Sequence, residues 1–163
     1  MSRPRRWVWF FSLLALLGAG AVVAPWLYNL HMQLKPEQLA AARQRWQENG
    51  PADYNLELHQ KEDEGAEEVC LVKVRGGRVA GVVVDGKGLT PSEFATRAGW
   101  QPPTVPDLLD RIEDELEEDL SGGKRRNYAT ARFDERTGCP LRYVRVDRAK
   151  HRLAWTVKLL PAE

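Results

Sequence analysis

The sequence predicts an α+β fold in which an antiparallel sheet carries two helices on one face, preceded by an N-terminal transmembrane helix. Residues 7–30 form an uncharged run of 24 residues. Residues 36–163 alternate helical periodicity with period-2 patterns in the order α-βββ-α-βββ. Runs of strands joined by short turns favour antiparallel pairing, and the length after residue 35 is enough for one domain with one core.

The uncharged run 7–30 is long enough to cross a membrane as one helix, because roughly 20 residues span the hydrocarbon core. Residues 1–6 carry three arginines, whereas Lys35 is the only full charge close to the other end. Positive flanks stay in the cytoplasm, so residues 1–6 are predicted to form a cytoplasmic tail and residues 36–163 an extracytoplasmic domain. The sequence thus predicts a single-pass protein of the cell membrane.

A cleaved signal peptide is the competing interpretation of the same segment. Residues 21–24 (AVVA) have small side chains at the spacing of a cleavage site, but Pro25 would directly follow the cut, where proline usually blocks cleavage. The apolar run also exceeds the roughly 7–15 residues of a typical signal-peptide core. These features favour an uncleaved signal-anchor, while cleavage within residues 1–24 stays open as the alternative.

Charge is distributed unevenly, although the net charge is only +1. Residues 36–120 carry 9 Lys or Arg and 19 Asp or Glu, whereas residues 121–163 carry 11 and 4. One interpretation is a basic face for nucleic acid or anionic lipid. The favoured interpretation is that the two segments lie side by side and neutralise each other, because the basic residues are spread along strands. An extracytoplasmic location also argues against a nucleic-acid partner.

The domain is predicted to begin with a helix from Pro36 to about Gln47, which Asn49-Gly50-Pro51 ends. One face of this helix carries, at helical spacing, Leu39, Ala42, Arg43 and Trp46.

Three strands are expected next, at residues 54–59, 69–75 and 78–84. The first alternates apolar and polar side chains, and Gly76-Gly77 joins the other two as a two-residue hairpin. The acidic segment 61–68 is interpreted as a solvated hairpin tip, because it lacks the spaced carboxylates of a calcium loop.

Residues 86–103 are rich in glycine and proline and are predicted to form a long surface loop. Phe94 and Trp100 are expected to pin this loop to the body of the domain. Long ordered loops often carry function, so the segment is a candidate binding region.

A second helix is predicted from Thr104, whose side chain and Asp107 match a capping box. Its apolar stripe comprises Val105, Leu108, Leu109, Ile112, Leu116 and Leu120. The acids on the other side are interpreted as a solvated face and not as paired catalytic carboxylates: Asp110, Glu113, Asp114, Glu117 and Glu118.

Three more strands are expected at residues 128–134, 140–147 and 152–160. In the second of them, Val144 and Val146 share one face, and Tyr143 and Arg145 share the other. Tyr143 and Arg145 are assigned to the face that an antiparallel sheet can leave open to solvent or a partner.

No catalytic, cofactor-binding or metal site is predicted. His59, His151 and the acids around Asp134 are the best candidates for an enzyme, but no catalytic order or ligand spacing accompanies them. Cys70 and Cys139 form a possible disulfide outside the cytoplasm. The sequence leaves open whether their Cα atoms lie within disulfide range.

Several short motifs follow one another in a fixed order: Trp46, Asp53-Tyr54, residues 74–79 (VRGGRV), residues 104–110 with Ile112, and Asp134…Gly138-x-Pro140 followed by Asp147. This order resembles the bacterial family called domain of unknown function 6174, over roughly residues 40–150. The resemblance implies a small envelope domain, often behind a signal or lipoprotein anchor, with no known activity and no catalytic residue to transfer. The chain departs from the family pattern in lacking a closely spaced cysteine pair after the first strand and in carrying Cys139 where an aromatic residue is common.

The function favoured by these observations is a membrane-anchored binding or accessory module of the cell envelope, not an enzyme. Its possible partner surface comprises Phe94, Trp100, Tyr143 and Arg145. A structural domain secreted after signal-peptide cleavage is the alternative, and an enzyme of unknown type is less favoured. The expected partners are the membrane, through residues 7–30, and an envelope protein that the sequence does not name.

Overall fold

The computed structural model describes residues 7, 9–14, 17–18, 33–121, 127–147 and 149–162. The chain divides into two compact units, residues 1–33 and 34–163. Within the described part of the chain, no helix is both long enough and apolar enough to span a bilayer. The predicted cytoplasmic tail and most of the predicted transmembrane segment lie outside the described residues.

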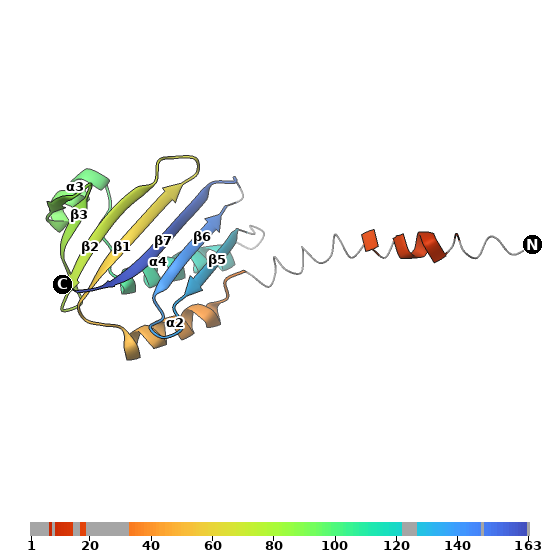
Figure 1. Cartoon of the computed structure of the whole chain (residues 1–163), viewed down its shortest axis with the longest axis horizontal. Coiled ribbons are helices and arrows are strands. Elements are labelled where there is room, and N and C mark those ends of the chain that lie inside the picture. Colours follow the sequence, from red (N-terminus) through yellow and green to blue (C-terminus); the bar gives the residue numbers. More distant parts are fainter. Residues whose placement is uncertain are drawn as a thin grey trace, which may run out of the picture. The chain divides into compact units, whose positions relative to one another are not determined.

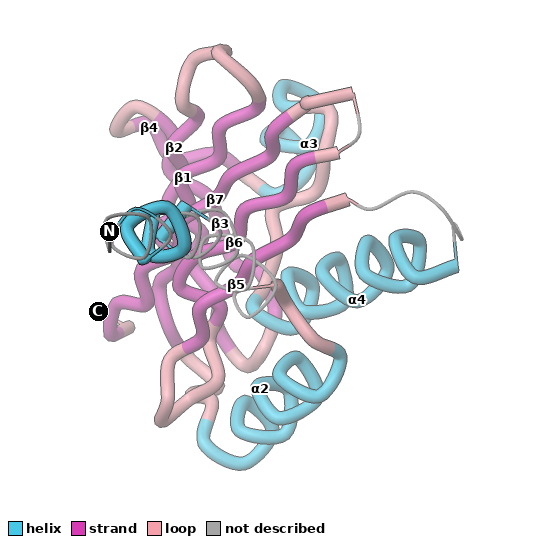
Figure 2. The backbone as a smooth tube through the Cα atoms, turned by 90° about the vertical axis from the view of Figure 1, so that its right-hand side faces the viewer, coloured by secondary structure: helices cyan, strands magenta, loops and turns pink. Residues whose placement is uncertain are grey.

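The described residues of the second unit form one antiparallel sheet and the helices that cover it (Figure 1). The elements are α2 (Pro36–Asn49), β1 (Tyr54–Glu62), β2 (Glu68–Arg75), β3 (Arg78–Val84), β4 (Lys87–Leu89), α3 (Pro91–Ala98), α4 (Val105–Ser121), β5 (Tyr128–Phe133), β6 (Pro140–Val146) and β7 (Arg152–Pro161). The strand order is β4-β3-β2-β1-β7-β6-β5, with β1 paired to β2 and β7 at the centre. Helices α2, α3 and α4 lie on the same side of the sheet (Figure 2). The predicted α+β class is confirmed.

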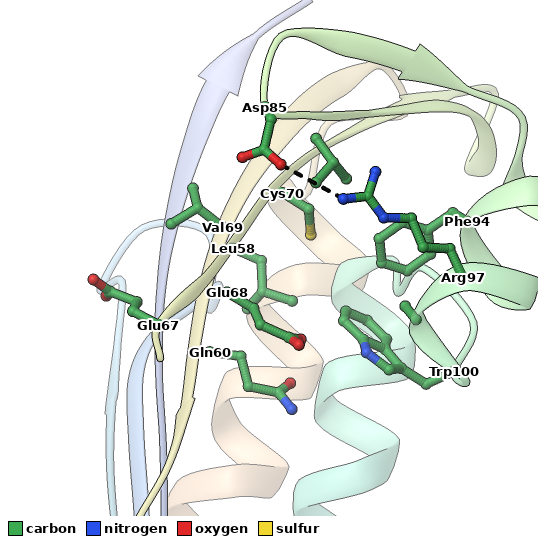
Figure 3. A pocket seen from close by; sticks show the side chains of 12 residues that line it. Leu58, Gln60, Glu67, Glu68, Val69, Cys70, Asp85, Phe94, Arg97 and Trp100 are labelled. Carbon is green, nitrogen blue, oxygen red and sulfur yellow. Dashed lines mark ion pairs between the residues drawn. The ribbon is translucent and has the colours of Figure 1, made fainter. Parts of the chain in front are cut away.

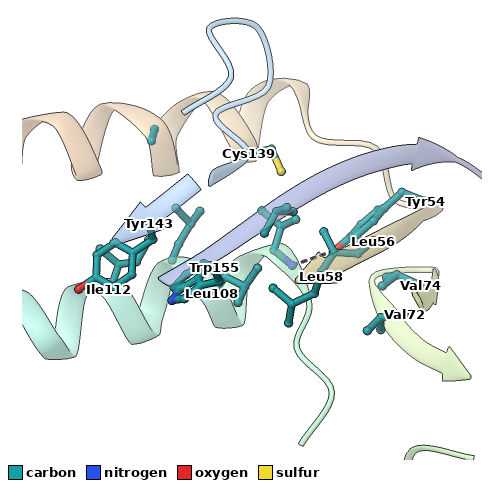
Figure 4. Close-up of a cluster of buried hydrophobic side chains, with 14 of the residues drawn as sticks. Tyr54, Leu56, Leu58, Val72, Val74, Leu108, Ile112, Cys139, Tyr143 and Trp155 are labelled. Carbon is teal, nitrogen blue, oxygen red and sulfur yellow. Dashed lines mark hydrogen bonds between the residues drawn. The ribbon is translucent and has the colours of Figure 1, made fainter. Parts of the chain in front are cut away.

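Alternation along the strands decides which side chains enter the core. Tyr54, Leu56 and Leu58 of β1 point to the helix side and lie opposite Val74, Val72 and Cys70 of β2 (Figure 4). Helix α4 packs its buried stripe against them, consisting of Val105, Leu108, Leu109, Ile112 and Leu116. Each fully buried aliphatic side chain contributes about 1.5–3 kcal/mol by leaving water. This single core closes within residues 34–163, so the second unit has what it needs to fold by itself.

The start of α4 confirms the predicted capping box. The Asp107 carboxylate accepts bonds from the backbone N–H and the hydroxyl of Thr104, both at 2.7 Å. The Val105 N–H donates to the Tyr54 hydroxyl oxygen at 3.0 Å, inside the core. Burial raises the pKa of Tyr54 to about 12, so its hydroxyl stays neutral. A helix terminus leaves N–H groups without intrahelical partners, and here a residue of the central strand supplies one.

Two glycine-containing turns fix the ends of the sheet. Gly76 and Gly77 both adopt positive φ angles, as a two-residue hairpin requires, and the Gly76 N–H donates to Asp53 Oδ1 at 2.6 Å. Gly138 has a φ of 77°, and a Cβ placed there would lie 2.0 Å from the Ala42 carbonyl oxygen. The turn before β6 therefore rests directly on the backbone of α2.

The prediction of a long loop over residues 86–103 was wrong, because the segment contains β4 and α3. Thr90 caps α3 by accepting a bond from the Glu93 N–H at 3.3 Å, and Gly99 ends the helix in the left-handed conformation. An eight-residue helix is too short for apolar periodicity to be visible in the sequence. The expectation that Phe94 pins the segment is confirmed, since Phe94 is buried and packs edge-to-face on Trp100 with ring centroids 4.9 Å apart.

Candidate functional site

A cavity of about 230 Å³ lies between α3 and the inner face of the β1–β3 sheet (Figure 3). Its apolar walls come from Leu58, Cys70, Val84, Phe94, Ala98 and Trp100. Its polar groups come from Gln60, Glu67, Glu68, Asp85 and Arg97. We call this feature the α3 pocket.

The α3 pocket exists because the β1–β2 hairpin extends beyond the short helix that covers it. Gln60 and Glu68 are cross-strand partners and share the inward face with Leu58 and Cys70. At this end of the sheet the inward positions carry polar side chains in place of apolar ones. In Figure 3, the polar ends of Gln60 and Glu68 point toward the Trp100 ring.

The charges around the α3 pocket are mostly negative. Arg97 lies 3.6 Å from Asp85, and both side chains are more than half exposed. Glu67 points away from the pocket and lies 3.2 Å from His59 Nδ1. Glu68 has no ion-pair partner within the described part of the chain. The Glu68 carboxylate is therefore available to a cationic group that enters beside Trp100.

The Cys70 thiol forms part of the pocket wall but is poorly suited to act as a nucleophile. Burial, helped by the nearby Glu68 charge, raises the pKa of Cys70 to about 11. The reactive species is the thiolate, which is scarce at neutral pH when the pKa is this high.

Cys70 and Cys139 are both buried free thiols, so the possible disulfide does not form in this structure. Cys70 lies on β2 and Cys139 directly precedes β6, and β1 and β7 run between these two strands. Three interstrand steps of about 4.8 Å separate them by roughly 14 Å, whereas a disulfide needs Cα atoms within about 7 Å.

Tyr143 and Arg145 lie on the face covered by α4, so their assignment to the open face was wrong. Tyr143 is 1% exposed, packs on Trp155, and donates its hydroxyl to Glu115 Oε2 at 2.7 Å. Arg145 Nη2 lies 2.6 Å from Asp119 Oδ1, with these side chains 18% and 9% exposed. Val144 and Val146 occupy the other face instead. The face of β6 that turns toward α4 is the one whose side chains pack on an aromatic ring or pair with charged groups of α4. The smaller apolar surface of the valines does not outweigh these contacts.

The groups considered for an enzyme do not come together. His59 contacts Glu57 and Glu67 at 2.9 and 3.2 Å, and these contacts, Glu57 foremost, raise its pKa. His151 lies 2.9 Å from Asp63, which raises the pKa of this exposed histidine.

Asp134 organises the turn before β6. Its Oδ1 accepts bonds from the Thr137 N–H and hydroxyl, both at 2.7 Å, and these bonds lower its pKa. Each candidate group thus has its own local structural partner.

Sequence reasoning missed four polar residues that the fold directs inward. Gln60 and Glu68 reach the α3 pocket, while Glu115 and Asp119 meet β6 beneath α4. For the first pair, the available signal was the alternation along the strands. Gln60 and Glu68 each lie two residues from a buried apolar residue, Leu58 and Cys70, and therefore face the same side of the sheet. For the second pair, the sequence offered only the large number of acids in α4, which does not show which of them meet β6.

The sequence model of a family described as a family of unknown function, DUF6174, matches residues 38–153. The chain belongs to this family. A search of curated proteins gave no match. The match spans all ten described elements of the second unit at least in part, and it includes the whole lining of the α3 pocket.

The motifs that carry the resemblance to DUF6174 have structural roles. Asp53 binds the Gly76 N–H, Asp107 caps α4, and Gly138 brings a turn onto α2. These motif residues of DUF6174 therefore stabilise turns and a helix start of the domain, and membership of the family assigns no chemistry to the α3 pocket.

Proposed function

We propose that this DUF6174 protein is a non-enzymatic binding module of the bacterial cell envelope, held at the membrane by an uncleaved signal-anchor. In this proposal residues 7–30 span the membrane, residues 1–6 stay in the cytoplasm, and the folded unit faces outward. The α3 pocket receives one basic side chain from an extended segment of an envelope protein. Nucleic acid has no part in the proposal.

The anchor is supported by sequence. The 24 uncharged residues match the length of a spanning helix, and the three arginines lie on the side expected to stay in the cytoplasm. Pro25 argues against cleavage directly after residues 21–24. The proposal therefore favours the anchored form over the secreted alternative.

The size and chemistry of the α3 pocket support a side chain as its occupant. Its volume of about 230 Å³ lies below the roughly 300–1,000 Å³ of pockets that hold drug-sized ligands. A lysine or arginine stem would lie along the apolar walls, as long basic side chains do at apolar surfaces. The cation would then meet the Glu68 carboxylate and the Trp100 ring, which attract it by charge and by cation–π contact. The single observation that carries this proposal is that the Glu68 carboxylate, at an apolar pocket, has no ion-pair partner among the residues that the structure describes.

Site-specific photo-crosslinking in intact cells tests the pocket. A photoreactive residue replaces Arg97 at the pocket rim, with the matched control at Glu117 on the exposed side of α4. The expected result is one envelope protein attached from position 97 and absent from position 117.

Glu68→Gln should lower the yield of that adduct by about tenfold, because a charge-assisted contact of about 1.5 kcal/mol is lost. Glu64→Gln removes the same charge from the exposed hairpin tip and should leave the yield unchanged. Equal adducts from both labelled positions, or a full yield from Glu68→Gln, would overturn the assignment of the pocket.

Intact-mass measurement of the protein purified from membranes tests the anchor separately. The full mass, combined with digestion of the folded unit by protease added outside the cytoplasm, is the expected result. A product that begins at residue 25 would refute the anchor and leave the secreted structural domain.

A further inference from the structure

The open face of the sheet carries a concentration of basic residues on β5–β7. Arg132 and Arg142 face each other in register on β5 and β6, and Arg142 pairs in turn with Thr156 of β7. Lys158 occupies the next position on this face of β7. All four side chains are exposed, and α2, α3 and α4 all lie on the other side of the sheet.

Directly opposed like charges destabilise an antiparallel pair, so the Arg132–Arg142 contact needs an explanation. Neither guanidinium takes part in an ion pair within the described part of the chain. Glu57, an acid on this face, lies opposite Lys158 and binds His59. The two arginines thus present uncompensated charge, together with a hydroxyl and an ammonium group, to whatever approaches the face.

The structure also separates charges that the sequence suggested would neutralise one another. Among the basic residues after position 121, Arg145 pairs with Glu118 and Asp119 of α4. Arg132, Arg142 and Lys158 instead lie on the opposite side of the sheet from α4. The favoured neutralisation of the two segments therefore holds in part, through Arg145 on Glu118 and Asp119, while the open face of β5–β7 keeps basic charge that no described acid pairs with.

We propose that the open face of β5–β7 docks on the anionic lipid headgroups of a membrane. Guanidinium groups bind phosphate oxygens through planar, bidentate hydrogen bonds, and lysine adds a point charge. A sheet face that spreads its cations over three strands fits a surface of many phosphates better than it fits one bound ion. This inference extends the proposed function, because it depends on a membrane anchor to bring the face near lipid.

The short linker between the proposed spanning segment and α2 is the reason to propose lipid as the partner of the open face. Residues 31–35 alone separate the proposed spanning segment from the start of α2. Five extended residues reach at most about 18 Å, so an anchored domain would remain within this distance of the headgroups. The anionic surface within constant reach of the open face is therefore the membrane.

Vesicle co-sedimentation of residues 34–163 tests the docking in the absence of the anchor and independently of any partner of the α3 pocket. This unit has its own core and all the described strands, so it is used alone. It should bind vesicles of phosphatidylcholine mixed equally with phosphatidylglycerol, and it should not bind phosphatidylcholine vesicles. Binding should weaken as salt rises, because salt screens exposed charges.

The variant that tests the face is Arg132→Gln with Arg142→Gln. Each lost charge should weaken binding to the anionic vesicles about fivefold, from the ~1 kcal/mol that a basic residue gains at such a surface. The matched control is Lys87→Gln with Arg136→Gln, which removes two exposed charges outside this face and should bind as the parent does. A melting temperature no lower than that of the parent checks that the tested variant is folded.

Three outcomes would overturn the proposal. One is no binding to the anionic vesicles, and another is an equal loss in the control variant. The third is binding of inorganic phosphate or soluble polyglutamate without vesicle binding, which would assign the face to a free anion or an acidic protein. Failure here would leave the proposed pocket intact, because photo-crosslinking at Arg97 probes the opposite side of the sheet.

Discussion

Helix α4 covers β6 with seventeen residues, whereas α3 covers β3 and β4 with eight. Under α4, two inward polar groups are paired, with Tyr143 on Glu115 and Arg145 on Asp119, while Trp155 Nε1 is buried without a hydrogen-bond partner among the described residues. Under α3, the inward polar groups Gln60 and Glu68 line a cavity beyond the end of the helix. One half of the sheet is thus closed by side-chain pairing, and the other half is left accessible.

The difference shows how a single sheet can combine a rigid part with a binding part. Buried polar groups without partners destabilise a protein, and the α4 half pairs the buried Tyr143 hydroxyl and the largely covered Arg145 guanidinium internally. Exposed polar groups are satisfied by water until a ligand replaces it, so the α3 half tolerates Glu68 without a protein partner. Mutations should therefore act on stability in the α4 half and on binding in the α3 half.

The largest expected effect is on the turn that joins β5 to β6. In Gly138→Ala, the new Cβ would lie 2.0 Å from the Ala42 carbonyl oxygen at a φ of 77°, so α2 must move. We expect a loss of at least about 3 kcal/mol in the free energy of unfolding, measured by urea denaturation.

The matched control for Gly138→Ala is Gly76→Ala in the β2–β3 hairpin. Gly76 also has positive φ, but nothing lies within 4 Å of its added Cβ. The control should lose only the roughly 1–2 kcal/mol that an L-residue needs in the left-handed region. Equal losses in both variants would show that the contact with α2 adds nothing.

The next prediction compares stability in the half of the sheet under α4 with stability in the half under α3. Tyr143→Phe removes the hydroxyl that donates to Glu115, whose side chain is only 14% exposed. The unfolding free energy should fall by about 1–2 kcal/mol, since a bond to a charged group is lost while Arg111 still binds the carboxylate. Glu68→Gln, at the exposed end of the pocket, should change stability by less than about 0.5 kcal/mol. Comparable losses in both variants would remove the distinction between a structural half and a binding half.

The sequence predicted the parts of the fold that local chemistry determines. Gly76-Gly77 marked a hairpin, and Thr104 with Asp107 marked a helix start, because backbone conformation and capping depend on neighbouring residues. The face of Tyr143 was assigned wrongly, because its alternation pattern is symmetric and only contact with α4 decides which side is inward. The α3 pocket was out of reach for the same reason, since it joins β1, β2 and α3 across a distance that no local pattern encodes.

A smaller effect concerns the hairpin that borders the α3 pocket, where His59 binds Glu57 and Glu67. Its raised pKa means that this contribution to stability is fully present below the ordinary histidine pKa of 6.5 and is lost as pH rises through the raised value. The lowered pKa of Glu57 means that its share is present above 4.5 and is lost as pH falls through the lowered value. Stability from this cluster should therefore peak in the acidic range between the two transitions.

NMR titration of His59 together with thermal melts from about pH 5 to about pH 9 would measure this dependence. His59→Gln should remove the part of the stability decline that follows the His59 titration, while the His151 titration stays unchanged. A His59 titration at or below pH 6.5 would contradict the contacts on which the prediction depends.

The smallest expected effect is a gain in the free energy of unfolding, from a substitution on the open face of the sheet. Arg132 and Arg142 face each other across β5 and β6, so removing one charge relieves a repulsion that nothing described on that face offsets. Arg142→Gln should raise the free energy of unfolding by about 0.5 kcal/mol at low salt, with the gain shrinking as salt is added. Arg145→Gln, three residues along β6 and facing α4, should instead lower stability, because it leaves Asp119 largely covered without its cation. Opposite responses from these two arginines of β6 would show that one face of this sheet is built for stability and that the other retains charge at the expense of stability, as a surface that meets an anionic partner would.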